Sequence, residues 1–178
     1  MTDLVVLSMM LAGPKHGYQL KHEAGLIFGQ QTLHNNVIYP LLRRFLEDGW
    51  VSKKEVPGER GQTRLQYALT PQGRRVLLER LSQFSEANAA SEDEFRFRVA
   101  MFDLLAPDVR EKILDLRESY LKALDKRMAA LETKMQLTRY PGEVVGQMRE
   151  HIELDAKWIP RLRRLIKSDQ KSDQRRSS

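Results

Sequence analysis

One segment of the chain changes from helical to strand periodicity, and it limits the possible folds more than any other feature. It reads WVSKKEVPGERGQTRLQYALT over residues 50–70. Leu65, Tyr67 and Leu69 recur at period two, and the stretch PGERG interrupts the segment. Alternation around a glycine-rich, charged turn is typical of a two-stranded antiparallel hairpin. We therefore expect a hairpin with a basic loop.

Segments with apolar residues at helical spacing precede and follow this hairpin. Three helical segments precede it, within residues 4–11, 16–28 and 33–48, and a fourth starts at Thr70-Pro71. Threonine is a favourable helix cap, and proline fits the first turn. Three helices, a hairpin and a closing helix predict a winged helix-turn-helix domain over residues 1–84. The expected fold class is mainly α, of the α+β type.

The third predicted helix, LHNNVIYPLLRRFLEDGWV, has a polar front and an apolar rear. His34, Asn35 and Asn36 are weak helix formers, and Pro40 removes a backbone donor. A recognition helix presents its N-terminal residues to base edges, while its rear packs on the helix before it. Because asparagine can make a bidentate contact to adenine, we expect Asn35 and Asn36 to face the major groove. The alternative is that either amide simply caps the helix.

A second domain is expected over residues 92–166, after the polar joint SEANAASEDE at residues 85–94. Two long helices, separated by the turn TRYPGE, carry apolar residues every 3.5 to 3.7 positions, roughly the helical and coiled-coil periods. The stripes contain Val109, Ile113, Leu116, Tyr120, Leu124, Met128, Leu131 and Met135, then Val145, Met148, Ile152, Ala156, Ile159, Leu162 and Ile166. A small winged domain cannot cover both stripes, so we expect a homodimer. Residues 167–178 are expected to form a flexible basic tail.

Charge and composition indicate the kind of partner. The 178 residues contain no cysteine and carry a net charge of +6. Residues 1–80 contain 11 Lys or Arg against 7 Asp or Glu, so much of the basic surplus lies in the winged domain, as expected for a polyanionic partner. No apolar run reaches the length of about 20 residues that a membrane span needs, and no evident leader precedes the first helix. We expect a cytoplasmic protein without a membrane partner.

Four stretches together resemble the PadR family of bacterial transcriptional regulators: GPKHGYQLKHE, VIYPLLRRFLEDGWV, GERGQTRLQYALTPQGRRVL and EDEFRFRVAMF. The resemblance is dense over residues 4–80 and looser over 92–166, as in the branch with a long C-terminal domain. It implies a dimer held by the C-terminal helices, most often a repressor, bound to an inverted repeat that overlaps a promoter. Activation would use the same binding surface. The resemblance also implies that a small aromatic molecule, such as a phenolic compound, acts as an inducer.

When the DNA contacts of the family are assigned to matching positions of this sequence, further residues are expected to contact DNA. Tyr18 and Lys21 would face phosphates, Tyr39 the groove, and the arginines of the wing the adjacent minor groove or backbone. The full set of expected DNA contacts is Tyr18, Lys21, His34, Asn35, Asn36, Tyr39, Arg43, Arg60, Gln62, Thr63 and Arg64.

The sequence departs from the family pattern at two places. The wing commonly reads Gly-Arg-Pro-Arg, whereas this chain has GQTR, so Gln62 and Thr63 replace a charge and a rigid ring. The wing is therefore expected to bind DNA less tightly. Pro160 lies within the last predicted helix, where it should kink or divide the apolar stripe.

Other functions find less support in the residues. His16, His22, His34 and His151 are not spaced as metal ligands, and neither a phosphate-binding glycine loop nor an activated nucleophile is evident. We expect no enzyme activity, no metal and no cofactor. The alternative function is a helical interaction module whose winged domain binds protein instead of DNA; acidic residues on the third helix and hairpin would favour it, but basic residues occur there.

An aromatic effector would need an apolar cavity with a few polar groups, most naturally between the winged domain and the C-terminal helices. Met9, Phe95, Tyr120 and Trp158 are the candidate lining residues. The alternative for each is an ordinary position in the core.

Overall fold

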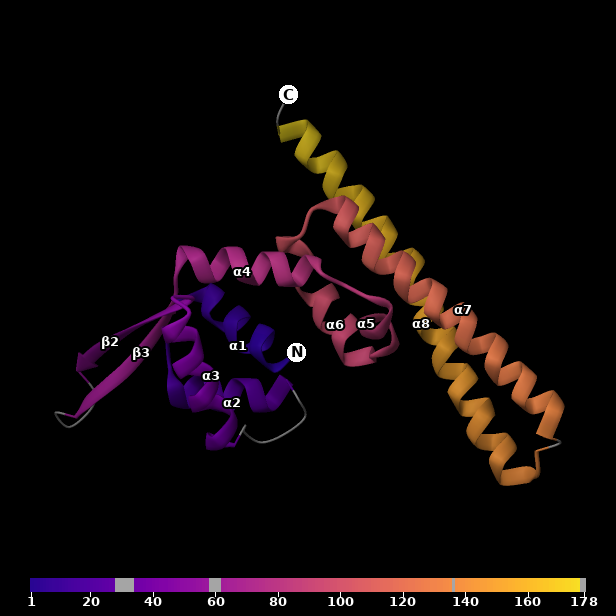
Figure 1. Ribbon diagram of the computed structural model, residues 1–178. Coiled ribbons are helices and arrows are strands. Elements are labelled where there is room, and N and C mark those ends of the chain that lie inside the picture. The colour runs from indigo at the N-terminus through magenta and orange to yellow at the C-terminus, as the bar shows by residue number, and fades with distance from the viewer. Residues whose placement is uncertain (28–33, 58–61, 136, 177–178) are drawn as a thin grey trace. The chain divides into compact units, whose positions relative to one another are not determined.

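The computed structural model describes residues 1–27, 34–57, 62–135 and 137–176, and the chain forms two compact units, Met1–Gln83 and Phe84–Ser178. Figure 1 shows the helices and strands of both units. Among the described residues, no helix is both long enough and apolar enough to cross a lipid bilayer.

The described residues of the N-terminal unit form four α-helices and a short 3-10 helix. These are α1 (Thr2–Met9), the 3-10 helix η1 (Met10–Ala12), α2 (Gly17–Ile27), α3 (Asn35–Glu47) and α4 (Pro71–Ser82). Their shared core consists of fully or almost fully buried side chains: Val5, Val6, Leu7, Leu20, Ala24, Ile38, Leu42, Phe45, Leu77 and Leu81. Burial of such side chains is the main stabilising term of a helical domain.

The sheet of this unit has three strands, in the order β1-β3-β2. Strands β2 (Val51–Pro57) and β3 (Thr63–Leu69) form the expected antiparallel hairpin, with Val51 opposite Leu69 and Pro57 opposite Thr63. The short β1 (Lys15–His16) adds a third strand that the sequence did not predict, because two residues are too few to show alternation. Helices with a small three-stranded sheet confirm the expected mainly α, winged-helix fold class.

The start of α4 is fixed to the end of α3 and the start of β2. The Thr70 hydroxyl oxygen accepts a hydrogen bond from the Gly73 amide at 3.0 Å and lies 2.7 Å from the Gly49 carbonyl oxygen, to which it donates. Gly73 is buried, and a Cβ atom at this position would lie 1.9 Å from the Trp50 carbonyl oxygen. The predicted Thr-Pro cap is therefore confirmed, and glycine three residues later permits the close approach.

The C-terminal unit contains α5 (Glu86–Ala90), α6 (Glu92–Ala100), the 3-10 helix η3 (Phe102–Leu104), α7 (Pro107–Met135) and α8 (Arg139–Arg176). The stretch expected to be a joint is instead largely helical. Ser85 caps α5 with a reciprocal bond to Asn88, and the Ser91 hydroxyl caps α6. Two serine caps separated by a few alanines make short helices from residues that look like a linker.

Helices α7 and α8 lie side by side over much of their length (Figure 1). The helix α8 runs from Arg139 to Arg176, so Pro160 does not divide it, and the helix continues through most of the segment expected to be a tail. The PG pair of TRYPGE lies in its first turn. The helices bury Ile113, Leu114 and Leu121 of α7 and Val145, Ile152, Ile159, Leu162 and Ile166 of α8.

Ion pairs between the same two helices fix their register along the helix axes. Arg163 of α8 pairs with Glu111, Asp115 and Glu118 of α7, which raises the pKa of its guanidinium. A hydrogen bond from Lys122, supported by Arg163, lowers the pKa of the Glu118 carboxyl. The contribution of this carboxylate to stability is therefore complete above its ordinary pKa and is lost as the pH falls through the lowered value.

Candidate nucleic-acid interface

The front of α3 is exposed and its amides are not used by the fold. His34, in extended conformation, is the N-cap residue, and its side chain makes no capping bond. Asn35 and Asn36 occupy the first turn; both are exposed, and within the described part of the chain neither amide has a hydrogen-bond partner. Capping by either amide, the alternative raised by the sequence, is therefore not seen among these residues. The amides are available to an outside partner.

The rear of α3 is anchored in the core. Ile38, Leu42 and Phe45 are buried, and the Phe45 ring lies 5.6 Å from the Trp50 ring, measured between centroids. Pro40 is exposed on the opposite side and leaves α3 continuous. The helix is thus held by one face, which is buried at Ile38, Leu42 and Phe45, while Asn35 and Asn36 at its start are exposed.

A shallow depression of about 310 Å³ lies beside the front of α3, and three of the expected DNA contacts surround it. Tyr18 comes from α2, Tyr39 from α3 and Arg64 from β3. The tyrosines are 71% and 45% exposed, so their rings are accessible in this domain. The structure therefore brings together residues that are far apart in sequence.

Gly17 allows the Tyr39 ring to approach α2. A Cβ atom on Gly17 would lie 3.3 Å from a ring carbon of Tyr39, closer than most real contacts. Beneath them lies Tyr67, and its burial, followed by the proximity of Tyr39, raises the pKa of the Tyr67 phenol. The residues His16, Gly17, Leu65 and Tyr67 also line this depression, and sequence reasoning did not select them. In the sequence, only Gly17, directly before Tyr18, could have indicated that the Tyr39 ring comes close to α2.

The remaining expected contacts are distributed around this centre. Arg43 is exposed on α3 and Lys21 is half-buried on α2. Gln62, Thr63 and Arg64 are exposed at the start of the second hairpin strand, while Arg60 lies outside the described residues. Arg44, by contrast, pairs with Asp3 of α1 at 3.7 Å and serves the fold.

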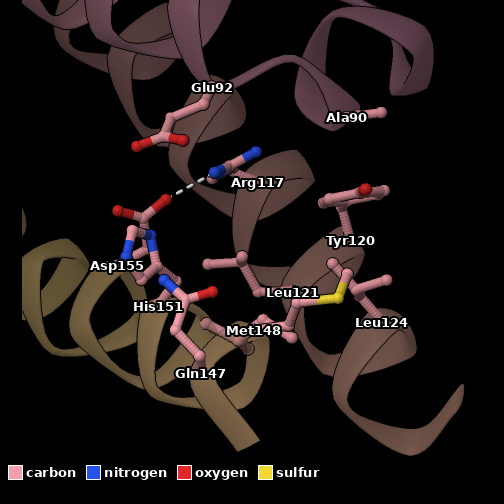
Figure 2. Close-up of a pocket in the computed structure, with 11 residues that line it drawn as sticks. Ala90, Glu92, Arg117, Tyr120, Leu121, Leu124, Gln147, Met148, His151 and Asp155 are labelled. Carbon is pink, nitrogen blue, oxygen red and sulfur yellow. Dashed lines mark hydrogen bonds and ion pairs between the residues drawn. The ribbon is translucent and has the colours of Figure 1, made fainter. Parts of the chain in front are cut away.

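Three of the four candidate effector residues, Phe95, Tyr120 and Trp158, belong to the C-terminal unit, where the Arg117 guanidinium lies against the rings of Phe95 and Tyr120. Met9 ends α1 of the N-terminal unit, and Phe95 is fully buried, in edge-to-face contact with Trp158 at 5.8 Å between centroids. Tyr120 alone of the four lines a pocket between α7 and α8 (Figure 2). Within the described ranges, no group of three or more His, Asp or Glu side chains is placed to hold a metal ion.

A protein family and several solved structures are similar to parts of this chain. Residues 6–79 match the family described as "Transcriptional regulator PadR-like family". A comparison with curated protein sequences found no match. Among solved structures, the chain is similar to a transcriptional regulator from Thermoplasma acidophilum, with 29% identity, a TM-score of 0.41, and coverage of 44% of this chain and 74% of the other.

Two further solved structures are similar. A PadR-family regulator from Eggerthella lenta has 31% identity and a TM-score of 0.38, with coverage of 43% of this chain and 65% of that one. The Bacillus subtilis PadR in complex with operator DNA has 17% identity and a TM-score of 0.44, with coverage of 92% and 98%. The family match covers residues 6–79, which lie in the N-terminal unit.

Proposed function

We propose that the protein binds double-stranded operator DNA through the front of α3 and acts as a dimeric, cytoplasmic repressor at an inverted repeat. The observation that supports this most is the first turn of α3, where Asn35 and Asn36 are exposed and have no hydrogen-bond partner among the described residues, while the core-facing side of the helix is buried. An asparagine side-chain amide can donate to N7 and accept from the N6 amino group of adenine in the major groove. It can do so only if no other group already bonds to the amide.

The surrounding residues suit contacts with the DNA backbone. Tyr18 and Tyr39 present hydroxyl groups beside α3, and Lys21, Arg43 and Arg64 supply positive charge on three different elements. Contacts to phosphates position a protein on the duplex, whereas contacts to base edges select the sequence. We therefore assign positioning to the tyrosines and cations, and base reading to the two asparagines.

The test begins with selection of tight-binding duplexes from a random pool by the full-length protein. Recovery of a palindromic consensus, with half-sites about one helical turn apart, is the expected result. Recovery of no consensus, with binding that does not depend on sequence, would contradict the proposed operator recognition.

Removal of a backbone contact should change the salt dependence. Arg64→Ala should weaken binding to every duplex and flatten the log–log slope of affinity against salt by about one unit, since each neutralised phosphate contributes roughly −0.9. Arg127→Ala, at an exposed position on α7, is the matched control and should leave the slope unchanged. Equal slopes for wild type and Arg64→Ala would place Arg64 away from the DNA.

The proposed dimer rests on an apolar face of α8 that α7 does not cover. Tyr140 and Val144 are four residues apart, and Leu154 and Leu165 are eleven apart; all four are exposed. These intervals keep the side chains on one side of a helix. An exposed apolar stripe of this length is typical of an interface between chains.

A charge on this face should separate the subunits. Leu154→Glu is expected to weaken self-association at least tenfold, because Leu154 is 66% exposed and contributes little to the fold of one chain. Ser119→Glu, at an exposed position on α7, is the control. The measurement is sedimentation equilibrium at micromolar concentration. A wild-type protein that sediments as a monomer would refute the dimer.

Release by a small aromatic effector, such as a phenolic compound, completes the proposal. The support is the resemblance to the long-C-terminal-domain branch of the family and a pocket in the C-terminal unit that Tyr120 lines.

A further inference from the structure

We propose that the pocket between α7 and α8 binds a small uncharged molecule with an apolar body and a hydrogen-bonding group at one end. The pocket has a volume of about 260 Å³ and lies beside the first residue of α6 (Figure 2). This volume is close to the lower end of the range of roughly 300–1,000 Å³ that is usual for ligand sites. It suits a molecule with one or two rings.

One part of the pocket wall is apolar. Leu121 and Leu124 come from α7, and Met148 and Ile152 from α8. The Tyr120 ring adds an aromatic surface. In Figure 2, Leu121, Leu124 and Met148 lie together at one end, and Glu92, Arg117 and Asp155 lie at the other. This division matches an amphipathic ligand.

The charges at the polar end are already paired. Arg117 is 4% and Asp155 8% exposed, and the Arg117 guanidinium donates a hydrogen bond to the Asp155 carboxylate. Glu92 forms an ion pair with Arg96, one turn along α6. An anionic or cationic ligand would therefore lose its hydration without gaining an unpaired counter-charge, which is costly in a partly buried site. An uncharged ligand avoids this cost.

The polar end retains hydrogen-bonding capacity for such a ligand. A guanidinium has five N–H donors. Arg117 uses Nη2 for Asp155 and Nη1 for the Ala89 carbonyl oxygen at 2.6 Å, whereas Nε is buried and has no partner in the described part of the chain. An unmet buried donor is unfavourable. Because Arg117 lines the pocket, a carbonyl or hydroxyl oxygen of the ligand would accept from a guanidinium N–H that faces it, and the Asp155 carboxylate can accept from an N–H or O–H of the same ligand.

The guanidinium is also held in place, as a binding group should be. Its central carbon lies 5.2 Å from the centroid of the Phe95 ring and 5.6 Å from that of Tyr120. Cation–π contacts on two aromatic rings, together with the bonds to Ala89 and Asp155, limit its rotation before any ligand arrives. If the proposed function holds, a ligand here is the effector, and it would act on the helices of the proposed dimer.

Three one-ring compounds of nearly equal shape test the proposal: benzamide, benzoate and benzamidinium. Each is titrated into the full-length protein without DNA, and binding is measured by nuclear magnetic resonance chemical shifts. We expect benzamide to bind at least about tenfold more tightly than either ion, because only the ions must leave a charge unpaired. Equal or tighter binding of benzoate or benzamidinium would overturn the proposal, as would the absence of any benzamide binding.

A substitution that fills the pocket tests whether benzamide binds there. Met148→Trp should reduce benzamide affinity at least about tenfold, because the larger side chain occupies the space beside Leu121 and Leu124. Both Met148 and the control position Glu150 on the same helix are exposed, so tryptophan should leave the fold intact at either, and Glu150→Trp should bind benzamide as the wild type does. An equal affinity in wild type and Met148→Trp would move the site elsewhere. Since no DNA is present, this failure is distinguishable from a failure of operator binding.

Discussion

Arg117→Met should destabilise the C-terminal unit by about 3–5 kcal/mol, because it leaves the buried Asp155 carboxylate without its partner. The guanidinium also donates to the Ala89 carbonyl oxygen, so the substitution removes a bond that connects α5 to α7. Methionine keeps most of the side-chain volume, and the loss is therefore mainly electrostatic. The measurement is urea unfolding followed by circular dichroism, fitted to the transition of this unit.

Two controls isolate the cause. Lys157→Ala removes an exposed ion pair with Glu153 on the same helix, and such pairs are worth about 1 kcal/mol or less. The double variant Arg117→Met/Asp155→Leu should recover part of the lost stability, since two apolar side chains leave no buried charge. A loss below about 1 kcal/mol for Arg117→Met would show that water reaches Asp155 easily.

Gly73→Ala should destabilise the N-terminal unit by about 3 kcal/mol, near the upper end of what overpacking usually costs. The added Cβ would lie 1.9 Å from the Trp50 carbonyl oxygen, and 2.7 Å from its carbon, so backbone must move. The Thr70 cap and the Gly49 carbonyl meet at the same place, so the shift would also disturb the start of the hairpin. Thermal unfolding of the full-length protein measures the effect.

Gly146→Ala is the matched control, because a Cβ atom there would meet nothing within 4 Å. It lies within α8, where alanine is favoured over glycine by roughly 0.5–1 kcal/mol, so a small gain in stability is expected. Unchanged stability of Gly73→Ala would mean that α4 can move away from the Trp50 carbonyl at little cost.

The N-terminal fold was predictable because its signals are local. Thr70-Pro71 has the chemistry of a helix start, the hairpin strands alternate, and the change from polar to apolar side chains along α3 matches its exposed front and buried rear. What local signals could not give is the meeting of Tyr18, Tyr39 and Arg64. Their approach depends on the missing side chain of Gly17 and on the packing of three elements.

The C-terminal unit was less predictable because a buried charge changes its pattern. The expected stripe of α8 included Met148 and Ala156, but both are exposed, and Asp155 is buried in their place. The reason is Arg117 on α7, whose burial demands a carboxylate nearby. Because Arg117 and Asp155 are both charged, a pattern of apolar residues includes neither of them. The exposed Met148 lines the pocket instead, with Tyr120, Leu124 and Ile152 of the same stripes.

The central claim is that the first turn of α3 reads base sequence, and one comparison tests it most directly. Binding of the selected duplex and of a scrambled duplex is measured for wild type, Asn36→Ala and Arg43→Ala. Asn36→Ala should reduce the preference for the selected duplex by roughly ten- to a hundredfold, since a bidentate contact discriminates by about 1–3 kcal/mol. Arg43→Ala should weaken both duplexes alike, as a phosphate contact does. If Asn36→Ala leaves the ratio of the two affinities unchanged, the front of α3 does not read bases, and the claim is wrong.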